Sequence, residues 1–159
     1  MPYEPGVLRA VGTRHEGEPC EAEVRTAGAP AALRLSVDRP VITTAPGDLA
    51  HVVFEVVDAQ GVVVPTADNR VTITVEGGTL LVMDNGDLRD HDPYRSDNRR
   101  AFKGRGLAAV RGDTRGRIRV TAKGRPVRAV RSSGVVLQCG FSAGAWSLLA
   151  AGELTDEQK

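Results

Sequence analysis

Apolar and polar residues alternate at a period of two along much of this chain, and this pattern constrains the fold more than any other feature. Three segments show it most clearly: Leu33–Val37, Val71–Val75 and Ile118–Ala122. In a fourth segment, Val52, Phe54 and Val56 form one face, with His51 and Glu55 on the other. Successive side chains of a β-strand point to opposite faces, so each segment predicts a strand with one face in the core. Helical spacing is not evident before the last residues of the chain.

Turn-forming residues separate the alternating segments. Ala45–Asp48, Asp58–Gly61 and Gly112–Gly116 combine Gly, Pro and Asp, which favour tight turns between strands. About seven or eight short strands are expected between Ala29 and Arg131. Short strands joined by turns, without helices between them, predict an all-β fold, an immunoglobulin-like antiparallel β-sandwich.

Residues 1–28 form a unit of their own. Two short strands are predicted around Leu8–Ala10 and Cys20–Val24, with a turn at Arg14–Pro19. A lone hairpin is at best marginally stable in water, so its apolar face needs partner strands. We interpret residues 1–28 as the C-terminal hairpin of a preceding immunoglobulin-like domain and residues 29–131 as the sandwich. The alternative is that the hairpin docks on the sandwich itself.

The tail, residues 132–159, has a different composition. Gly134–Gly152 is apolar and rich in Gly, Ala and Ser, but its apolar runs fall short of the roughly 20 residues that a membrane span needs. We therefore expect no membrane partner and assign no structure to the tail. One side of a short helix would carry Trp146, Leu149, Ala150 and Leu154.

Basic residues gather in one part of a chain whose net charge is only +1. The segment Arg95–Arg131 holds eleven Arg and two Lys against two acids, Asp97 and Asp113. Such a stretch could contact phosphates. Arg is the main cation of the whole chain, however, so we interpret the stretch as a solvated sheet face and expect no nucleic-acid partner.

Residue types that bind metals form no recognisable set. Cys20 and Cys139 lie far apart and indicate neither a disulfide framework nor a metal site, so the redox compartment is not readable. The histidines, His15, His51 and His91, are equally dispersed. We therefore expect no metal and no cofactor.

A polar loop follows the strand that ends near Met83. Its acids are Asp84, Asp87, Asp90 and Asp92. Their spacing does not fit a calcium-binding loop, so we interpret them as solvated acids paired with arginines, a structural cation being the alternative. The expected partners are Arg89, Arg95, Arg99 and Arg100. Tyr94 is the loop aromatic that a sugar ring would stack on. The candidate contact residues of this loop are Asn85, Asp87, Tyr94 and Asn98.

Five motifs follow one another in a characteristic order. They are Pro2–Val11, Arg25–Ala31, Val53–Asp58, Met83–Asp87 and Arg100–Gly104. In this order and spacing they resemble the C-terminal immunoglobulin-like domains of glycoside hydrolase family 2, of the β-galactosidase type. Each motif alone is weak, but the series covers most of the chain.

Two positions depart from the pattern of that family. Glu76–Thr79 stands where members usually have a turn similar to Gly-Pro-Gly, and Gly106 stands where they often have Cys. These differences concern local packing rather than the identity of the domain.

The resemblance implies a parent enzyme that hydrolyses glycosides with retention, using two carboxylates about 5 Å apart on a (β/α)8 barrel. This chain has neither the length nor the strand–helix alternation of such a barrel, so we predict no catalytic residues. The prediction is a non-catalytic accessory module whose partners are the other domains of the parent glycosidase, with carbohydrate as a further candidate.

Two other functions stay open from the sequence. One is a bacterial immunoglobulin-like adhesion or stalk module, and the weaker one is a carbohydrate-binding module. The compartment is unknown, since a bacterial parent would be periplasmic, extracellular or cytoplasmic.

Overall fold

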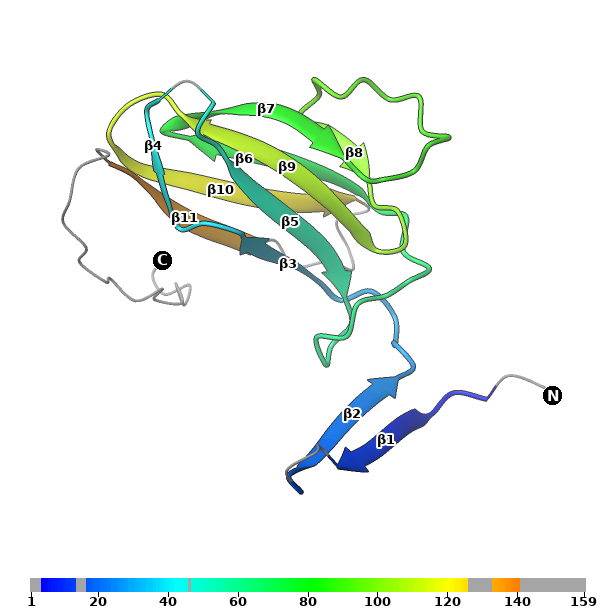
Figure 1. Cartoon of the computed structure of the whole chain (residues 1–159). Coiled ribbons are helices and arrows are strands. Elements are labelled where there is room, and N and C mark those ends of the chain that lie inside the picture. The colour runs from blue at the N-terminus through cyan, green and yellow to red at the C-terminus, as the bar shows by residue number, and fades with distance from the viewer. Residues whose placement is uncertain (1–3, 14–16, 46, 126–132, 141–159) are drawn as a thin grey trace, which may run out of the picture.

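The described part of the chain consists of β-strands and contains no helix (Figure 1). The structure, a computed structural model, describes residues 4–13, 17–45, 47–125 and 133–140. The all-β class predicted from the alternation is therefore confirmed. The strands are β1 (Val7–Thr13), β2 (Pro19–Arg25), β3 (Ala32–Val37), β4 (Val41–Thr43), β5 (Ala50–Val57), β6 (Arg70–Glu76), β7 (Gly78–Asp84), β8 (Asn98–Arg100), β9 (Arg105–Gly112), β10 (Gly116–Arg125) and β11 (Ser133–Gly140).

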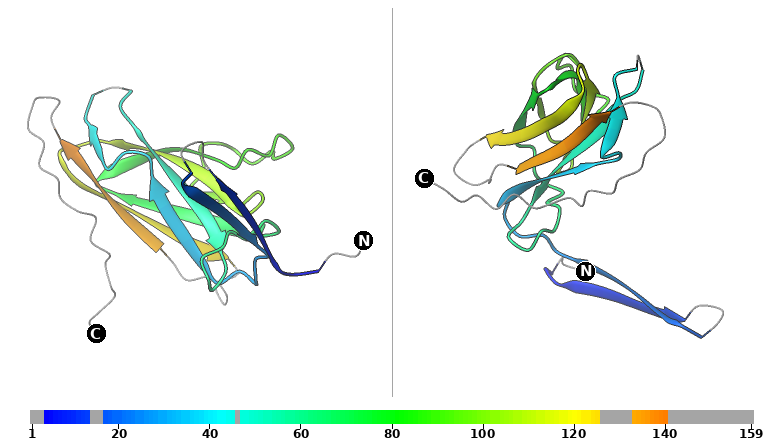
Figure 2. Two further views of the ribbon diagram at one scale, coloured as in Figure 1. Left: turned by 60° about the horizontal axis from the view of Figure 1, so that its bottom comes forward. Right: turned by 90° about the vertical axis from the view of Figure 1, so that its left-hand side faces the viewer.

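Strands β3 to β11 form two sheets that pack face to face (Figures 1 and 2). One sheet has four strands in the order β3-β5-β9-β7, and the other has five in the order β4-β11-β10-β6-β8. Neighbouring strands are antiparallel, except that β11 runs parallel to β4. This arrangement confirms the predicted immunoglobulin-like sandwich.

The core lies between the two sheets and follows the alternation in the sequence. Every second residue of β5 points inward, and the same holds for β10 in the facing sheet, because side chains alternate between the faces of a strand. These inward residues are Ala50, Val52, Phe54, Val56, Ile118, Val120 and Ala122, all fully buried. Phe102, which follows β8, is half-buried.

The sandwich extends further along the chain than residues 29–131. Strand β11 lies in the segment that we left without structure, and it pairs with β10 from Gly116↔Cys139 to Ala122↔Ser133. Leu137 and Cys139 of β11 are buried in the core. In β11, Val135, Leu137 and Cys139 recur at every second position. This short pattern was not recognised as a strand because it lies within a longer apolar stretch rich in glycine. The helix predicted around Trp146–Leu154 lies outside the described residues.

A separate two-stranded sheet, β1 with β2, precedes the sandwich and projects away from it (Figures 1 and 2). The register runs from Val7↔Arg25 to Thr13↔Pro19, and every residue of both strands is exposed. The two strands predicted in residues 1–28 are therefore present. No helical segment in the described parts of the chain has the length and apolar character that a membrane crossing requires.

Candidate functional site

The loop between β7 and β8 extends from the edge of the sandwich (Figure 1) and carries three of the four candidate contact residues, Asn85, Asp87 and Tyr94, while the fourth, Asn98, is the first residue of β8. Its start is fixed by Asp84, whose Oδ1 accepts hydrogen bonds from the backbone N–H groups of Asn85 (2.7 Å) and Gly86 (3.1 Å). Its far part is fixed by the N–H of Met83, which donates to the carbonyl oxygen of Tyr94 (2.8 Å). The loop is thus closed on itself by hydrogen bonds.

Asn85 organises the inside of the loop. Its Oδ1 accepts from the N–H of Asp87 (3.0 Å). Its Nδ2 donates to Oδ2 of Asp90 (2.7 Å) and to the carbonyl oxygen of Arg100 in β8 (3.1 Å). Because one amide group holds both sides of the loop and the adjoining strand, Asn85 is a structural residue of the loop.

Arg99 of β8 is buried beneath the loop, with 1% of its surface exposed. Its Nη1 donates to Oδ2 of Asp90 (2.9 Å) and its Nη2 to the carbonyl oxygen of Asp92 (2.7 Å). The guanidinium also lies 4.9 Å from the centre of the Tyr94 ring, a cation–π distance. This one side chain therefore joins three positions of the loop to the sheet.

The acid of this buried pair is held in its charged form. The backbone N–H of Asp92 donates a hydrogen bond to Oδ1 of Asp90 (2.9 Å). This bond is the largest cause that lowers the pKa of Asp90, and the contacts with Asn85 and Arg99 lower it further. Hydrogen bonds to a carboxylate favour its ionised state. The loop is thus built around an ion pair between the buried Arg99 and the half-buried Asp90.

The predicted pairing of the loop acids with Arg89, Arg95, Arg99 and Arg100 is confirmed for two acids, Asp87 and Asp90, whereas Arg100 pairs with Asp68 outside the loop. Asp87 pairs with Arg89 (3.3 Å) and Asp90 with Arg99 (2.9 Å), and Asp92 pairs with Arg70 of β6 (2.8 Å). Among the described residues, no group of three or more His, Cys, Asp or Glu side chains is arranged to hold a metal ion.

The four predicted contact residues differ in exposure. Tyr94 is 59% exposed, whereas Asn85, Asp87 and Asn98 are half-buried. The Oδ1 of Asn98 accepts a hydrogen bond from Nη1 of Arg70 (2.6 Å), and its Nδ2 donates one to Oδ1 of Asp97 (2.7 Å). Tyr94 is therefore the accessible one of the four, while the three polar residues mainly hold the shape of the loop.

Two residues of this site were missed by the sequence reasoning. Leu88 at the tip of the loop is fully exposed, and nothing in the sequence distinguishes it from the apolar residues of a strand. Arg99 was expected to pair with the loop acids, as it does with Asp90, but its burial was missed because it was placed on a solvated face with the rest of Arg95–Arg131. The members of that stretch on the outer face of β10, Arg117, Arg119 and Lys123, are indeed exposed.

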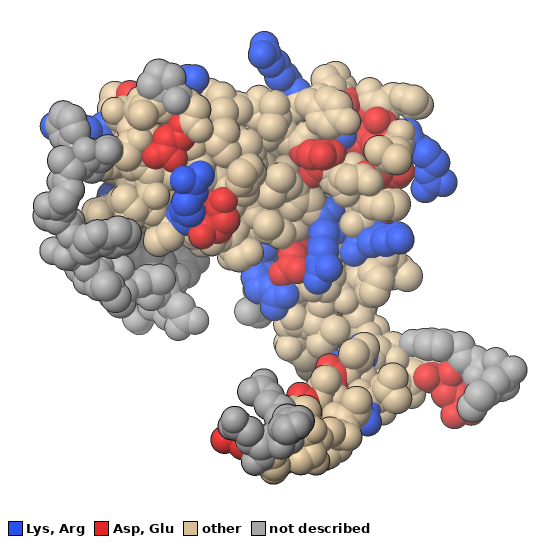
Figure 3. Space-filling model, in the orientation of Figure 1, with Lys and Arg blue, Asp and Glu red and all other residues tan. Residues whose placement is uncertain are grey.

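Charges of both signs are interspersed on the visible face of the molecule (Figure 3). On the outer face of the four-stranded sheet, Glu55 bridges two cations, Arg34 (2.7 Å) and Arg105 (3.0 Å). The described residues in this view thus present a mixed surface rather than a field of one sign.

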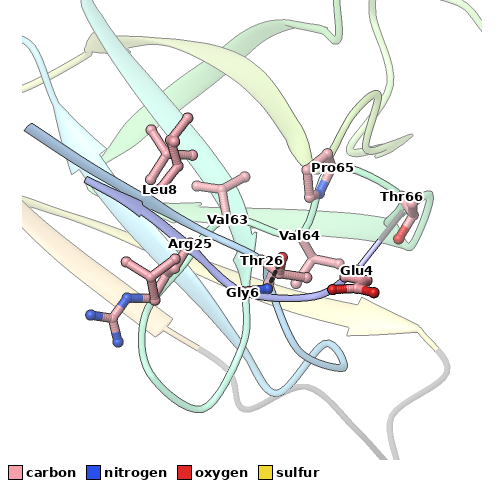
Figure 4. A pocket seen from close by; sticks show the side chains of 12 residues that line it. Glu4, Gly6, Leu8, Arg25, Thr26, Val63, Val64, Pro65 and Thr66 are labelled. Carbon is pink, nitrogen blue, oxygen red and sulfur yellow. Dashed lines mark hydrogen bonds between the residues drawn. The ribbon is translucent and has the colours of Figure 1, made fainter. Parts of the chain in front are cut away.

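An open groove of about 550 Å³ lies where the hairpin meets the sandwich (Figure 4). One wall comes from the hairpin and the other from Val63–Thr66, which follow β5. Near its base, the N–H of Gly6 donates to Oγ1 of Thr26 (3.0 Å). The hairpin thus borders the sandwich at this groove, while both of its strands stay exposed.

Two packed antiparallel sheets with a preceding hairpin define an immunoglobulin-like β-sandwich domain. Residues 33–132 match the family model described as "Glycoside hydrolase family 2 C-terminal domain 5". The chain belongs to this family, and the resemblance seen in the sequence is confirmed.

Similar proteins are much longer than this chain. It is 34% identical over 128 residues to Beta-galactosidase BoGH2A of Bacteroides ovatus, an alignment that covers 79% of the chain and 15% of that protein. A glycosyl hydrolase family 2 member from Bacteroides cellulosilyticus has a TM-score of 0.78 and 28% identity, covering 89% of this chain and 18% of that one. A β-glycosidase from Bacteroides vulgatus shares the fold, with a TM-score of 0.78, 22% identity and coverage of 87% and 18%. The chain spans less than a fifth of each.

Proposed function

We propose that this chain is a non-catalytic accessory module of a family 2 glycoside hydrolase of the β-galactosidase type, in which it supports or shapes the catalytic barrel. The observation that carries the proposal is the family match over residues 33–132, in a chain that corresponds to 15% of a β-galactosidase. The match supports a glycosidase module over the adhesion or stalk module considered above.

The state of the loop acids supports a non-catalytic role. Retaining glycosidases need two carboxylates about 5 Å apart, one of them free to attack the sugar. Here Asp87, Asp90 and Asp92 are each paired with an arginine. Asp84 in turn accepts two backbone N–H groups. These four loop carboxylates are thus engaged in holding the loop, which suits structure better than hydrolysis.

The two faces of the hairpin support its assignment to a preceding domain. Directly opposed residues share a face, and one face carries only apolar or small residues, in the pairs Leu8↔Val24, Ala10↔Ala22 and Gly12↔Cys20. The other face carries charges, including the ion pair between Arg9 and Glu21. An apolar face with Leu8 75% exposed and Val24 69% exposed is one that a second sheet would cover.

The size of this apolar face favours strands of the same polypeptide as its cover. Two strands of seven residues present roughly 200 Å², from a rise of about 3.3 Å per residue and a strand spacing of about 4.8 Å. Stable interfaces between separate proteins need about 800 Å² per partner. A second copy of the chain would therefore bind too weakly, whereas linked strands act at high effective concentration.

The β7–β8 loop is the second contact that we assign to the parent enzyme. Leu88 is fully exposed at its tip and Tyr94 is 59% exposed, while hydrogen bonds and Arg99 hold the loop in shape. An ordered loop that presents apolar groups loses little conformational entropy on binding. We assign it to the surface of a neighbouring domain.

Carbohydrate binding is the second candidate function of this loop, because the Tyr94 ring is exposed and supported from below by Arg99. A single ring gives a small stacking surface. Isothermal titration of the chain with galactosides tests this function, and binding that disappears in Tyr94→Ala would establish it.

The non-catalytic role is tested by assaying the purified 159-residue chain with a chromogenic β-galactoside. We expect no hydrolysis above the rate in buffer. Turnover at enzyme-like rates would contradict the proposal.

A further inference from the structure

The connection between the hairpin and the sandwich is short and held at several points. It comprises residues 26–31, between the end of β2 and the start of β3. The N–H of Thr26 donates to the carbonyl oxygen of Gly6 (2.9 Å), and the N–H of Ala31 donates to that of Val57 (2.8 Å). The side chain of Ala27 packs against the core. Linkers between domains usually have few such contacts.

One bond in the middle of this connection comes from a buried acid. The N–H of Gly28 donates to Oδ2 of Asp58 (2.8 Å). Asp58 follows β5 and is only 4% exposed. A hydrogen bond to a charged acceptor is about twice as strong as one between neutral groups. Gly28 is therefore held more firmly than an ordinary linker residue.

The other oxygen of Asp58 holds the turn in which it lies. Oδ1 accepts from the N–H groups of Gln60 (2.9 Å) and Val62 (2.8 Å). Gly61 completes this turn with a φ of 80°, a conformation that favours glycine. The carboxylate therefore has two functions, since Oδ1 shapes the turn and Oδ2 reaches across to the connection.

Both walls of the groove depend on this arrangement. Val63–Thr66 directly follow the Asp58 turn, and the hairpin wall is attached through residues 26–31. The backbone of Val64 also donates to the carbonyl oxygen of Val56 (2.9 Å), which fixes that wall to β5. The carboxylate of Asp58 thus connects the hairpin, through Gly28, with the turn that leads into Val63–Thr66.

We infer that Asp58 is a positioning residue that fixes the orientation of the hairpin relative to the sandwich, through its hydrogen bond to Gly28. Under the proposed function, the same bond sets the angle at which the preceding domain meets this one. The fixed angle itself does not depend on that function, because it concerns only residues of this chain.

The bond is tested first by hydrogen exchange of the Gly28 amide in the whole chain. A group that exchanges only by local opening is expected to exchange about 100-fold or more slowly than in a free peptide. Asp58→Asn replaces one acceptor oxygen by an NH₂ group, and we expect the protection of Gly28 to fall at least about tenfold. A Gly28 amide that exchanges freely in the unchanged protein would overturn the inference.

Orientation is tested by residual dipolar couplings of the hairpin and the sandwich. In the unchanged chain we expect both sets to fit one alignment tensor, and in Asp58→Asn we expect the hairpin couplings to be reduced. Asp48→Asn is the matched control, because Asp48 holds a turn at Thr43 in the same way (2.8 Å) without contacting the hairpin connection. Hairpin couplings that change equally in both variants, or in neither, would contradict the assignment to Asp58.

A second pair of variants covers the case in which Asp58→Asn unfolds the sandwich. Gly28→Pro removes the donor and leaves the Asp58 turn unchanged. Gly28→Ala keeps the donor, and its added Cβ would lie 3.6 Å from Oδ2 of Asp58, an ordinary contact. We expect a freed hairpin in Gly28→Pro alone. A hairpin that stays aligned in Gly28→Pro would overturn the inference.

Discussion

The ring of Phe54 in β5 lies against the backbone of Gly106 in β9, in the space that any side chain at position 106 would occupy. Phe54 is fully buried, and a Cβ at residue 106 would overlap its ring atoms. The glycine at position 106 is thus explained by the size of its neighbour across the strands.

Gly106→Ala is expected to destabilise the sandwich by about 1–3 kcal/mol, the usual cost of overpacking a core. Urea denaturation measures the change in the free energy of unfolding. Gly134→Ala is the control, since its Cβ would meet its nearest atom at 3.5 Å. Phe54→Leu is expected to reduce the cost of Gly106→Ala, and equal costs in both backgrounds would contradict this explanation.

Arg99→Ala is expected to lower the free energy of unfolding by about 1–3 kcal/mol, because it removes the buried guanidinium and leaves the half-buried carboxylate of Asp90 without its ion partner. Arg100→Ala, in the next position, is the matched control. Arg100 is exposed and its pair with Asp68 (3.4 Å) is worth about 0–1 kcal/mol. If the two variants were equally stable in urea, Arg99 would not hold the loop.

Stability is expected to fall below about pH 4, in part through Asp90. The pKa of Asp90 is lower in the folded chain than its ordinary value of 3.8, chiefly through the N–H of Asp92. The folded state then binds fewer protons than the unfolded state, so this stabilisation is present above pH 4 and is lost as the pH falls through the folded pKa. In Asp90→Asn, the free energy of unfolding measured with urea should fall less steeply between pH 5 and pH 2. An unchanged dependence on pH would contradict a contribution from Asp90.

The two cysteines are expected to react with a thiol reagent at very different rates. Cys20 is exposed on the apolar face of the hairpin, whereas Cys139 is buried and burial raises its pKa. The thiolate is the reactive form, so Cys139 is slowed both by access and by ionisation. One thiol should be labelled quickly in native conditions and the second only on unfolding, and two fast thiols would contradict the position of β11.

The sequence predicted the parts of this fold that depend on local pattern. Val52, Phe54 and Val56 share one face of a strand whose other face carries His51 and Glu55, so the core face of β5 could be deduced without coordinates. Strand β11 could not, because glycines interrupt its alternation and its pairing with β10 is set by contacts far away in the chain. The turn at Asp58–Gly61 was predicted, but not that Asp58 reaches Gly28, which is 30 residues away.

The site was predicted less completely than the fold. Polar composition located the loop and its ion pairs, since Asp and Arg alternate there within a few residues. The burial of Arg99 was missed, because an arginine is normally exposed and only the tertiary arrangement of Asp90, Asp92 and Tyr94 makes its burial favourable.

The central claim is that this chain is one module of a larger glycosidase. The most direct test is the reactivity of the Cys20 thiol, measured in the chain alone and in the parent enzyme. The measurement compares the rate of thiol labelling in the 159-residue chain with the rate at the same residue in the parent enzyme. Fast labelling in the chain and labelling at least about 100-fold slower in the parent would show that a preceding domain covers the apolar face of the hairpin. Equal rates would contradict the account.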